Sequence, residues 1–168
     1  MLKDLNMQAL TDKKRDGLVT VVFVGLFFIM LAVLYYINLS NNLWGSFYTF
    51  LNSFVLSNIP GTGLSLPAPA NPANYTVLYN VAFEFCLGIG ILEMGILALR
   101  IAMRSPLPRK AETIENLVFW LGASYLVITY LVDMTIMSEW FVFWAGMILI
   151  GGLALVARGF VLLAGRNS

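Results

Sequence analysis

The sequence predicts an all-α integral membrane protein with four transmembrane helices. The chain of 168 residues is 60% hydrophobic and only 11% charged, and its mean hydropathy is +0.83. Soluble domains usually carry about 25% charged residues, so the composition argues against a water-soluble core. Four apolar stretches are each long enough to cross a bilayer, which takes roughly 20 helical residues. The ten Lys and Arg residues fall into three groups, with none between Asp16 and Leu99.

The first span is predicted at residues 18–37, an apolar run that ends in Tyr35 and Tyr36. A cleavable signal peptide has a shorter apolar core, and paired tyrosines are typical of a membrane interface, so we expect an uncleaved helix. Residues 1–17 form a separate, cytoplasmic N-terminal segment. This segment is either a short amphipathic helix on the membrane surface or a solvated start that only sets the topology.

The connection between the first two spans is expected to have two parts. Residues 43–57 place apolar side chains on one helical side, and this stretch is too short to span. We expect an amphipathic interfacial helix there, lying at the outer membrane surface or capping the bundle. The second part is a Pro-rich loop at 58–76, predicted to be irregular or extended chain because four prolines and two glycines interrupt it.

Three further spans are predicted at 77–103, 114–137 and 139–163, so residues 18–168 form one four-helix transmembrane domain. Ser105–Lys110 contains two prolines and two cations, and it is expected to break the helix as a basic turn. Four spans place both termini on one side, and the positive-inside rule makes that side the cytoplasm of a cell (plasma) membrane. Three tryptophans are expected near the outer interface: Trp44, Trp140 and Trp144.

The residue types present exclude several classes of function. The chain has no histidine and a single cysteine, Cys86. Zinc sites built on thiolates, and the usual axial ligands of haem, are therefore missing. We predict no metal, no cofactor and no catalytic residue set. The separated groups of cations also argue against a nucleic-acid partner, which needs a continuous basic face.

Two intramembrane carboxylates are the main candidates for function, because an ionisable group at that depth is costly. Glu84 in the second span and Asp133 in the third lie at similar predicted depths. We expect them to face each other in a hydrogen-bonded polar cluster completed by Asn80, Tyr125 and Thr129. This cluster could bind a cation or a proton, or its carboxylates could simply bond across helices and hold the bundle together.

Glu93 is the second buried carboxylate of the helix that carries Glu84. Nine helical steps separate the two residues and place them on opposite faces. A side-by-side pair of carboxylates on one helix is therefore excluded. Arg100 lies two turns further and either bends back toward Glu93 or extends to the cytoplasmic interface. Small residues predict helix-packing surfaces within the chain or between copies. They are Gly88 and Gly95 in the second span and Gly146, Gly151 and Gly152 in the fourth.

The sequence favours a non-catalytic multi-pass membrane protein. We expect a four-helix bundle that acts as a small subunit or self-assembling component, with the lipid bilayer and either its own copies in a homo-oligomer or other membrane subunits as partners. The alternative is a small proton or cation channel or carrier that uses Glu84 and Asp133, with Glu93 as a further candidate. A membrane enzyme working with Glu, Asp, Tyr and Arg alone is the least favoured class.

Overall fold

Four long helices dominate the structure, a computed structural model that describes the backbone of residues 2–134 and 136–165, with side chains from residue 17 onward. All four are long and apolar enough to cross a membrane, so this coarse part of the predicted fold class is confirmed. The helices are α1 (Leu2–Ile37), α3 (Thr76–Ala102), α4 (Leu107–Val127) and α5 (Ser138–Ala164). The helix α4 continues directly into a π-helical turn, η3 (Ile128–Val132).

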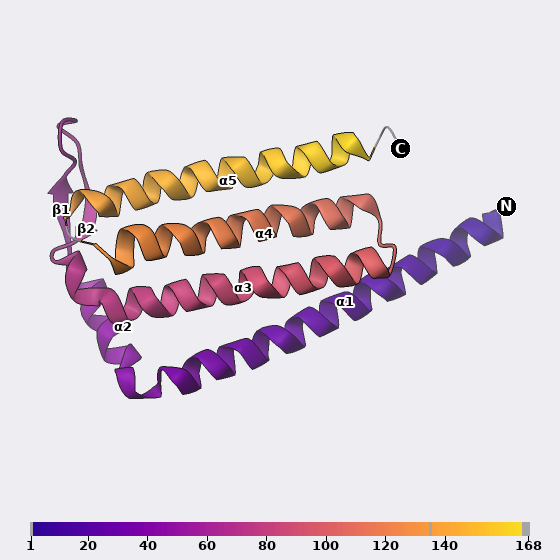
Figure 1. Cartoon of the computed structure of the whole chain (residues 1–168), viewed down its shortest axis with the longest axis horizontal. Helices are drawn as coiled ribbons and strands as arrows, with labels where there is room; N and C mark the ends of the chain where they lie inside the picture. The colour runs from indigo at the N-terminus through magenta and orange to yellow at the C-terminus, as the bar shows by residue number, and fades with distance from the viewer. Residues whose placement is uncertain (1, 135, 166–168) are drawn as a thin grey trace.

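The four helices lie side by side in a single row, in the order α1, α3, α4, α5 (Figure 1). The closest packing is between α3 and α4 and between α4 and α5, while α1 packs on α3. Short turns join α3 to α4 and α4 to α5, which makes successive helices antiparallel neighbours. The predicted four-helix bundle is an open row, because α1 and α5 lie at its two ends (Figure 1).

The connection between α1 and α3 contains a short helix and a β-hairpin. After the helical turn η1 (Leu39–Asn41), the helix α2 spans Leu43–Asn52. The predicted helix was too long, because Phe54–Asn58 is strand β1 and pairs antiparallel with β2 (Ser65–Pro69). Gly61 and Gly63 adopt positive φ in the turn between the strands, which favours glycine. The prolines of β2 are tolerated because both strands of a two-stranded sheet are edges.

The densest core lies where the hairpin and α2 cover the ends of α3, α4 and α5. Phe50 of α2 contacts Tyr79 of α3 and Trp140 of α5, with ring centroids 6.2 Å apart in both pairs. The Trp140 indole also donates to the Pro67 carbonyl of β2 at 3.4 Å. Trp140 is only 5% exposed, so it is a core residue at the start of α5, and its position at the outer interface stays a prediction. Trp44 and Trp144 are exposed.

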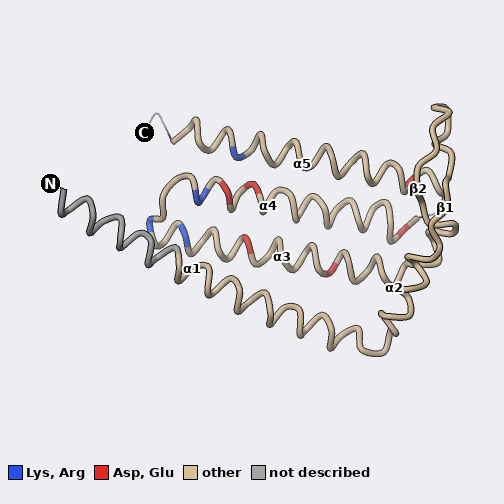
Figure 2. The backbone as a smooth tube through the Cα atoms, turned by 180° about the vertical axis from the view of Figure 1, so that it is seen from behind, with Lys and Arg blue, Asp and Glu red and all other residues tan. Residues whose placement is uncertain are grey.

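Charge is distributed unevenly along the row (Figure 2). The described cations lie toward the end where both termini are found, which we call the termini end; the opposite end, with β1 and β2, is the hairpin end. The turn between α3 and α4 is residues 103–106, with Arg104 in the left-handed region at φ 53°. Arg109 and Lys110 therefore belong to α4 and not to the basic turn that the sequence predicted.

Candidate functional site: a polar cavity around Glu93

Glu93 is the most deeply buried charged residue among those described, with 6% of its surface exposed. It projects from α3 toward α4, where the Asn116 amide donates to its Oε1 at 3.1 Å. The carboxylate lines a cavity of about 160 Å³ between α1, α3 and α4. We call this space the Glu93 cavity. Its lining residues are Val19, Thr20, Phe23, Glu93, Ile96, Arg100, Glu112, Thr113 and Asn116.

The wall at the termini end of the cavity is built around one backbone carbonyl. The Arg109 carbonyl accepts a hydrogen bond from Thr113 Oγ1 at 3.0 Å and another from the Arg100 guanidinium. Arg100 therefore reaches across to the start of α4, which neither of the two predicted orientations described. Its Nε is buried without a hydrogen-bond partner. Leaving a buried N–H group without a hydrogen-bond partner costs free energy, so most buried polar groups in proteins are paired and Arg100 Nε is an exception.

Two ion pairs tie the same end of the row together. Arg109 contacts Glu112 one turn along α4 at 3.1 Å. Arg158 of α5 contacts Glu115 of α4 at 2.9 Å, so this second pair joins two helices. Both pairs are partly exposed, and such pairs contribute about 0–1 kcal/mol each. Of these four residues only Glu112 lines the cavity, and the Glu93 carboxylate has an amide as its direct partner.

Glu84 faces the other side of α3 and meets α1. Asn38, directly after α1, donates from Nδ2 to Glu84 Oε2 at 2.9 Å, and also to the Leu34 carbonyl at 3.1 Å. Asn41 in turn donates to Asn38 Oδ1 at 2.9 Å. Asn38 is 5% exposed, so a buried amide closes the corner between α1 and η1. Sequence reasoning missed Asn38 because it lies just beyond the first span.

Two glycines of α3 lie on the same faces as the two carboxylates and contact the same neighbouring helices. A Cβ on Gly88, one turn after Glu84, would lie 2.6 Å from Met30 Sδ of α1. A Cβ on Gly90, one turn before Glu93, would lie 2.4 Å from Leu121 of α4. At both positions glycine lets a side chain of the neighbouring helix pack directly against the α3 backbone. The face of α3 that carries Glu84 packs on α1, and the face that carries Glu93 packs on α4.

The structure does not assemble the polar cluster that the sequence predicted. Among the described residues, no hydrogen bond joins Glu84 to Asn80, Tyr125, Thr129 or Asp133, and those four side chains are exposed. Tyr125 is 64% exposed. The Glu84 side of α3 packs on α1 and not on α4. In addition, η3 follows an i→i+5 pattern that changes the facing of residues beyond Val127. Asp133 consequently ends the helix at the hairpin end without meeting Glu84.

The predicted packing glycines divide into two groups. Gly88 contacts α1, and Gly146 contacts Leu126 of α4. A Cβ placed on Gly95, Gly151 or Gly152 would have no neighbour within 4 Å. In α5 the inward side is instead formed by Trp140, Phe143 and Ala154, the buried residues of that helix. Gly151 and Gly152 are therefore available on a surface that this chain does not cover.

The Glu93 cavity can exchange protons or hold a small polar species, because a buried carboxylate, an amide and two threonines converge there. Asn116 and Thr113 were also missed by sequence reasoning, because the turn was predicted at 105–110 and lies at 103–106. Glu93 precedes Arg104 by eleven residues and Asn116 follows Ser105 by eleven, so a tight antiparallel turn puts them at equal depth. Within the described residues, no group of three or more Cys, Asp or Glu side chains could hold a metal ion.

No protein-family model matches the chain, and it has no significant similarity to a curated protein or to a solved structure.

Proposed function

We propose that the chain is a non-catalytic, multi-pass subunit of a plasma-membrane assembly, joined to copies of itself or to other membrane subunits through α5. In this arrangement the four long helices cross the bilayer and the termini end faces the cytoplasm. The charge distribution supports this orientation, because the described Lys and Arg residues lie toward the termini end and inside-facing loops are rich in such residues.

The observation that carries the proposal is the uncovered outer face of α5. Ile148, Gly152, Leu155 and Gly159 follow one another at spacings of four, three and four residues, so they share a helical side. Ile148 is 79% exposed, and neither glycine has a neighbour where a Cβ would be. Glycines on such a face allow a second helix backbone to approach closely, which is how helices associate in lipid. We call these four residues the α5 face.

The proposal is tested by measuring assembly in nanodiscs with native mass spectrometry. Gly152→Leu and Gly159→Leu each place a side chain between the helices that would meet. We expect either change to weaken association about tenfold, the equivalent of about 1.4 kcal/mol of lost packing.

Gly25→Leu is the matched control, because Gly25 on α1 is equally open and lies outside the α5 face. The control variant should assemble like the wild-type protein. A wild-type chain that purifies as a monomer without other subunits, or glycine variants that assemble normally, would exclude this function.

A second candidate function, transfer of protons or cations, is favoured by the Glu93 cavity. A carboxylate that shares a polar cavity with Thr20, Thr113 and Asn116 resembles the proton-relay positions of membrane carriers. Of the three carboxylates that the sequence offered for this role, Glu93 fits best. Glu84 does not line this cavity, and Asp133 is exposed at the hairpin end.

Flux into proteoliposomes tests this alternative, with a pH-sensitive dye inside and an imposed membrane potential. Glu93→Gln keeps the size and the hydrogen-bonding capacity of the side chain but removes its titration, so we expect proton flux to be lost. Glu84→Gln is the matched control on the opposite face of α3 and should leave flux unchanged. Wild-type vesicles no leakier than empty ones would rule out the carrier.

A further inference from the structure

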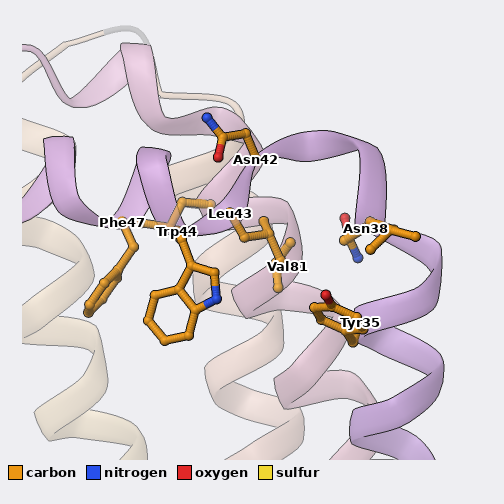
Figure 3. Close-up of a pocket in the computed structure, with 9 residues that line it drawn as sticks. Tyr35, Asn38, Asn42, Leu43, Trp44, Phe47 and Val81 are labelled. Atoms are coloured by element: carbon orange, nitrogen blue, oxygen red, sulfur yellow. The ribbon is translucent and has the colours of Figure 1, made fainter.

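A large hollow lies at the hairpin end between α1, α2 and α3, away from the Glu93 cavity. It has a volume of about 530 Å³. Figure 3 shows that Trp44, Phe47 and Leu43 of α2 approach it from one side, while Tyr35 of α1 and Val81 of α3 form other walls. We call this space the α2 hollow. Its surface is mostly apolar, and Leu39 and Leu78 complete the apolar lining.

Polar bonding at the corner after α1 keeps the hollow open. Asn38 is fixed by its bonds to the Leu34 carbonyl and to Glu84, so the end of α1 is tied to α3 at one point. Asn42 then takes the left-handed conformation at φ 42°, which redirects the chain into α2. The direction of α2 is therefore set by the backbone and by amide bonds. Apolar packing between Trp44 and the end of α1 does not close the gap.

The size and the lining of the hollow identify the chemistry of its occupant. A single water takes up about 30 Å³, and ordered waters need two to four polar partners each. The lining residues offer two amides, the Tyr35 hydroxyl and the Trp44 indole N–H, which are too few to hold water throughout 530 Å³ of space. The side chains of Leu43, Phe47 and Val81 instead match a hydrocarbon, whose burial against them gains about 0.8 kcal/mol per methylene.

The position of the hollow decides the source of that hydrocarbon. It lies where the apolar lengths of α1 and α3 end, beside the exposed aromatic side chains of Trp44 and Tyr48 on α2. Aromatic side chains of this kind gather at the level of lipid headgroups. Asn42 sits at the rim, is exposed, and points away from the hollow in Figure 3. A lipid with one chain in the hollow would bring its polar headgroup to this amide.

We propose that the α2 hollow is a binding site for one hydrocarbon chain of a membrane lipid in the leaflet at the hairpin end. This lipid site requires that the helices insert into a membrane, as proposed above, and it does not depend on how the chain assembles. The apolar walls hold the chain, and Asn42 with the indole of Trp44 meets the polar part of the lipid. The lipid separates α2 from α1 and so belongs to the folded structure at this end of the row.

Photochemical labelling in vesicles tests the proposal directly. The probe is phosphatidylcholine that carries a diazirine on one acyl chain, at a fixed fraction of the vesicle lipid, with labelled peptides mapped by mass spectrometry. We expect the segment 43–47 to be labelled above the level of Phe28, which is exposed on α1. Val81→Trp fills the hollow and should lower labelling of 43–47 about tenfold, because several methylenes lose their contacts.

Ile29→Trp is the matched control, because it adds the same bulk to the exposed face of α1. This variant should leave labelling of 43–47 unchanged. Leu78→Trp is a second hollow-filling variant with the same expected effect, should Val81→Trp fail to fold. Labelling of 43–47 that stays at the level of Phe28, or that survives both fillings, would overturn the lipid site. Loss of labelling at Phe28 as well would instead overturn membrane insertion.

Discussion

Each carboxylate within α3 has an asparagine as its direct partner, and this pairing is the main feature at the residue scale. Glu93 accepts from Asn116 at 3.1 Å, and Glu84 accepts from Asn38 at 2.9 Å. An amide donor satisfies a carboxylate whether or not it carries a proton, because the second oxygen stays free for that proton. The two pairs join α3 to α4 and α1 to α3, so they link three of the four long helices.

Replacing Asn38 tests the value of one such pair. Asn38→Ala leaves the Glu84 carboxylate without its amide donor, while the Leu34 carbonyl keeps the backbone N–H of residue 38. We expect the change to lower the free energy of unfolding by about 1–3 kcal/mol. Asn80→Ala is the matched control, because Asn80 is exposed on the same helix as Glu84, and a change of about 0.5 kcal/mol or less is expected there. Thermal unfolding in detergent measures both variants.

A double-mutant cycle then separates the pair from general packing. The double variant Asn38→Leu with Glu84→Leu removes both polar groups at once, so neither is left buried without its partner. We expect it to lower the free energy of unfolding by less than the sum of the two single changes. Additive losses from the two substitutions would show that the hydrogen bond between Asn38 and Glu84 contributes nothing to stability.

At the scale of single elements, the sequence predicted the long helices well and the connection poorly. The four long helices follow from apolar length alone, because a membrane span must bond its backbone internally. The strand β1 could not be predicted in the same way. Residues 43–54 carry apolar side chains at helical spacing, and only pairing with Ser65–Pro69 makes Phe54–Asn58 extended. That pairing depends on a turn and is not a local preference.

The π-helical turn η3 shows a second limit of sequence reasoning. A regular helix would align Tyr125, Thr129 and Asp133 on one stripe, and the predicted polar cluster depended on that stripe. The switch to i→i+5 bonding at Ile128–Val132 changes which way the last residues face. Periodicity in the sequence carries no mark of such a switch. The Glu93 and Asn116 pair depends on the short turn at 103–106, which fixes their relative depth, whereas the sequence placed the turn at 105–110.

At the scale of the whole molecule, the arrangement of the helices in a row could not be read from the sequence. Lipid tails and leucine side chains are equally apolar, so a face that meets lipid has the same composition as a face that meets another helix. The exposed side of α5 is as apolar as its buried side. Hydropathy therefore predicts which segments cross the membrane but leaves the neighbours of each helix open.

The proposed orientation is testable on intact cells with a membrane-impermeant maleimide. In a Cys86→Ala background, Thr62→Cys places a thiol in the hairpin turn and Pro106→Cys places one in the turn between α3 and α4; both positions are exposed. We expect labelling of Thr62→Cys from outside, and labelling of Pro106→Cys only after lysis. Cys86→Ala alone is the unlabelled control. The reverse pattern would place the termini outside the cell.

The single row has a consequence for any traffic across the bilayer. A layer one helix thick encloses no lumen along its own described length, so a passage would have to follow a junction between adjacent helices or between separate chains. The Glu93 cavity lies at the junction of α1, α3 and α4, whereas the α5 face would border the partner in the proposed assembly. Substitutions that loosen the packing around the Glu93 cavity would alter permeation in a single chain. Substitutions on the α5 face would do so only in the proposed assembly.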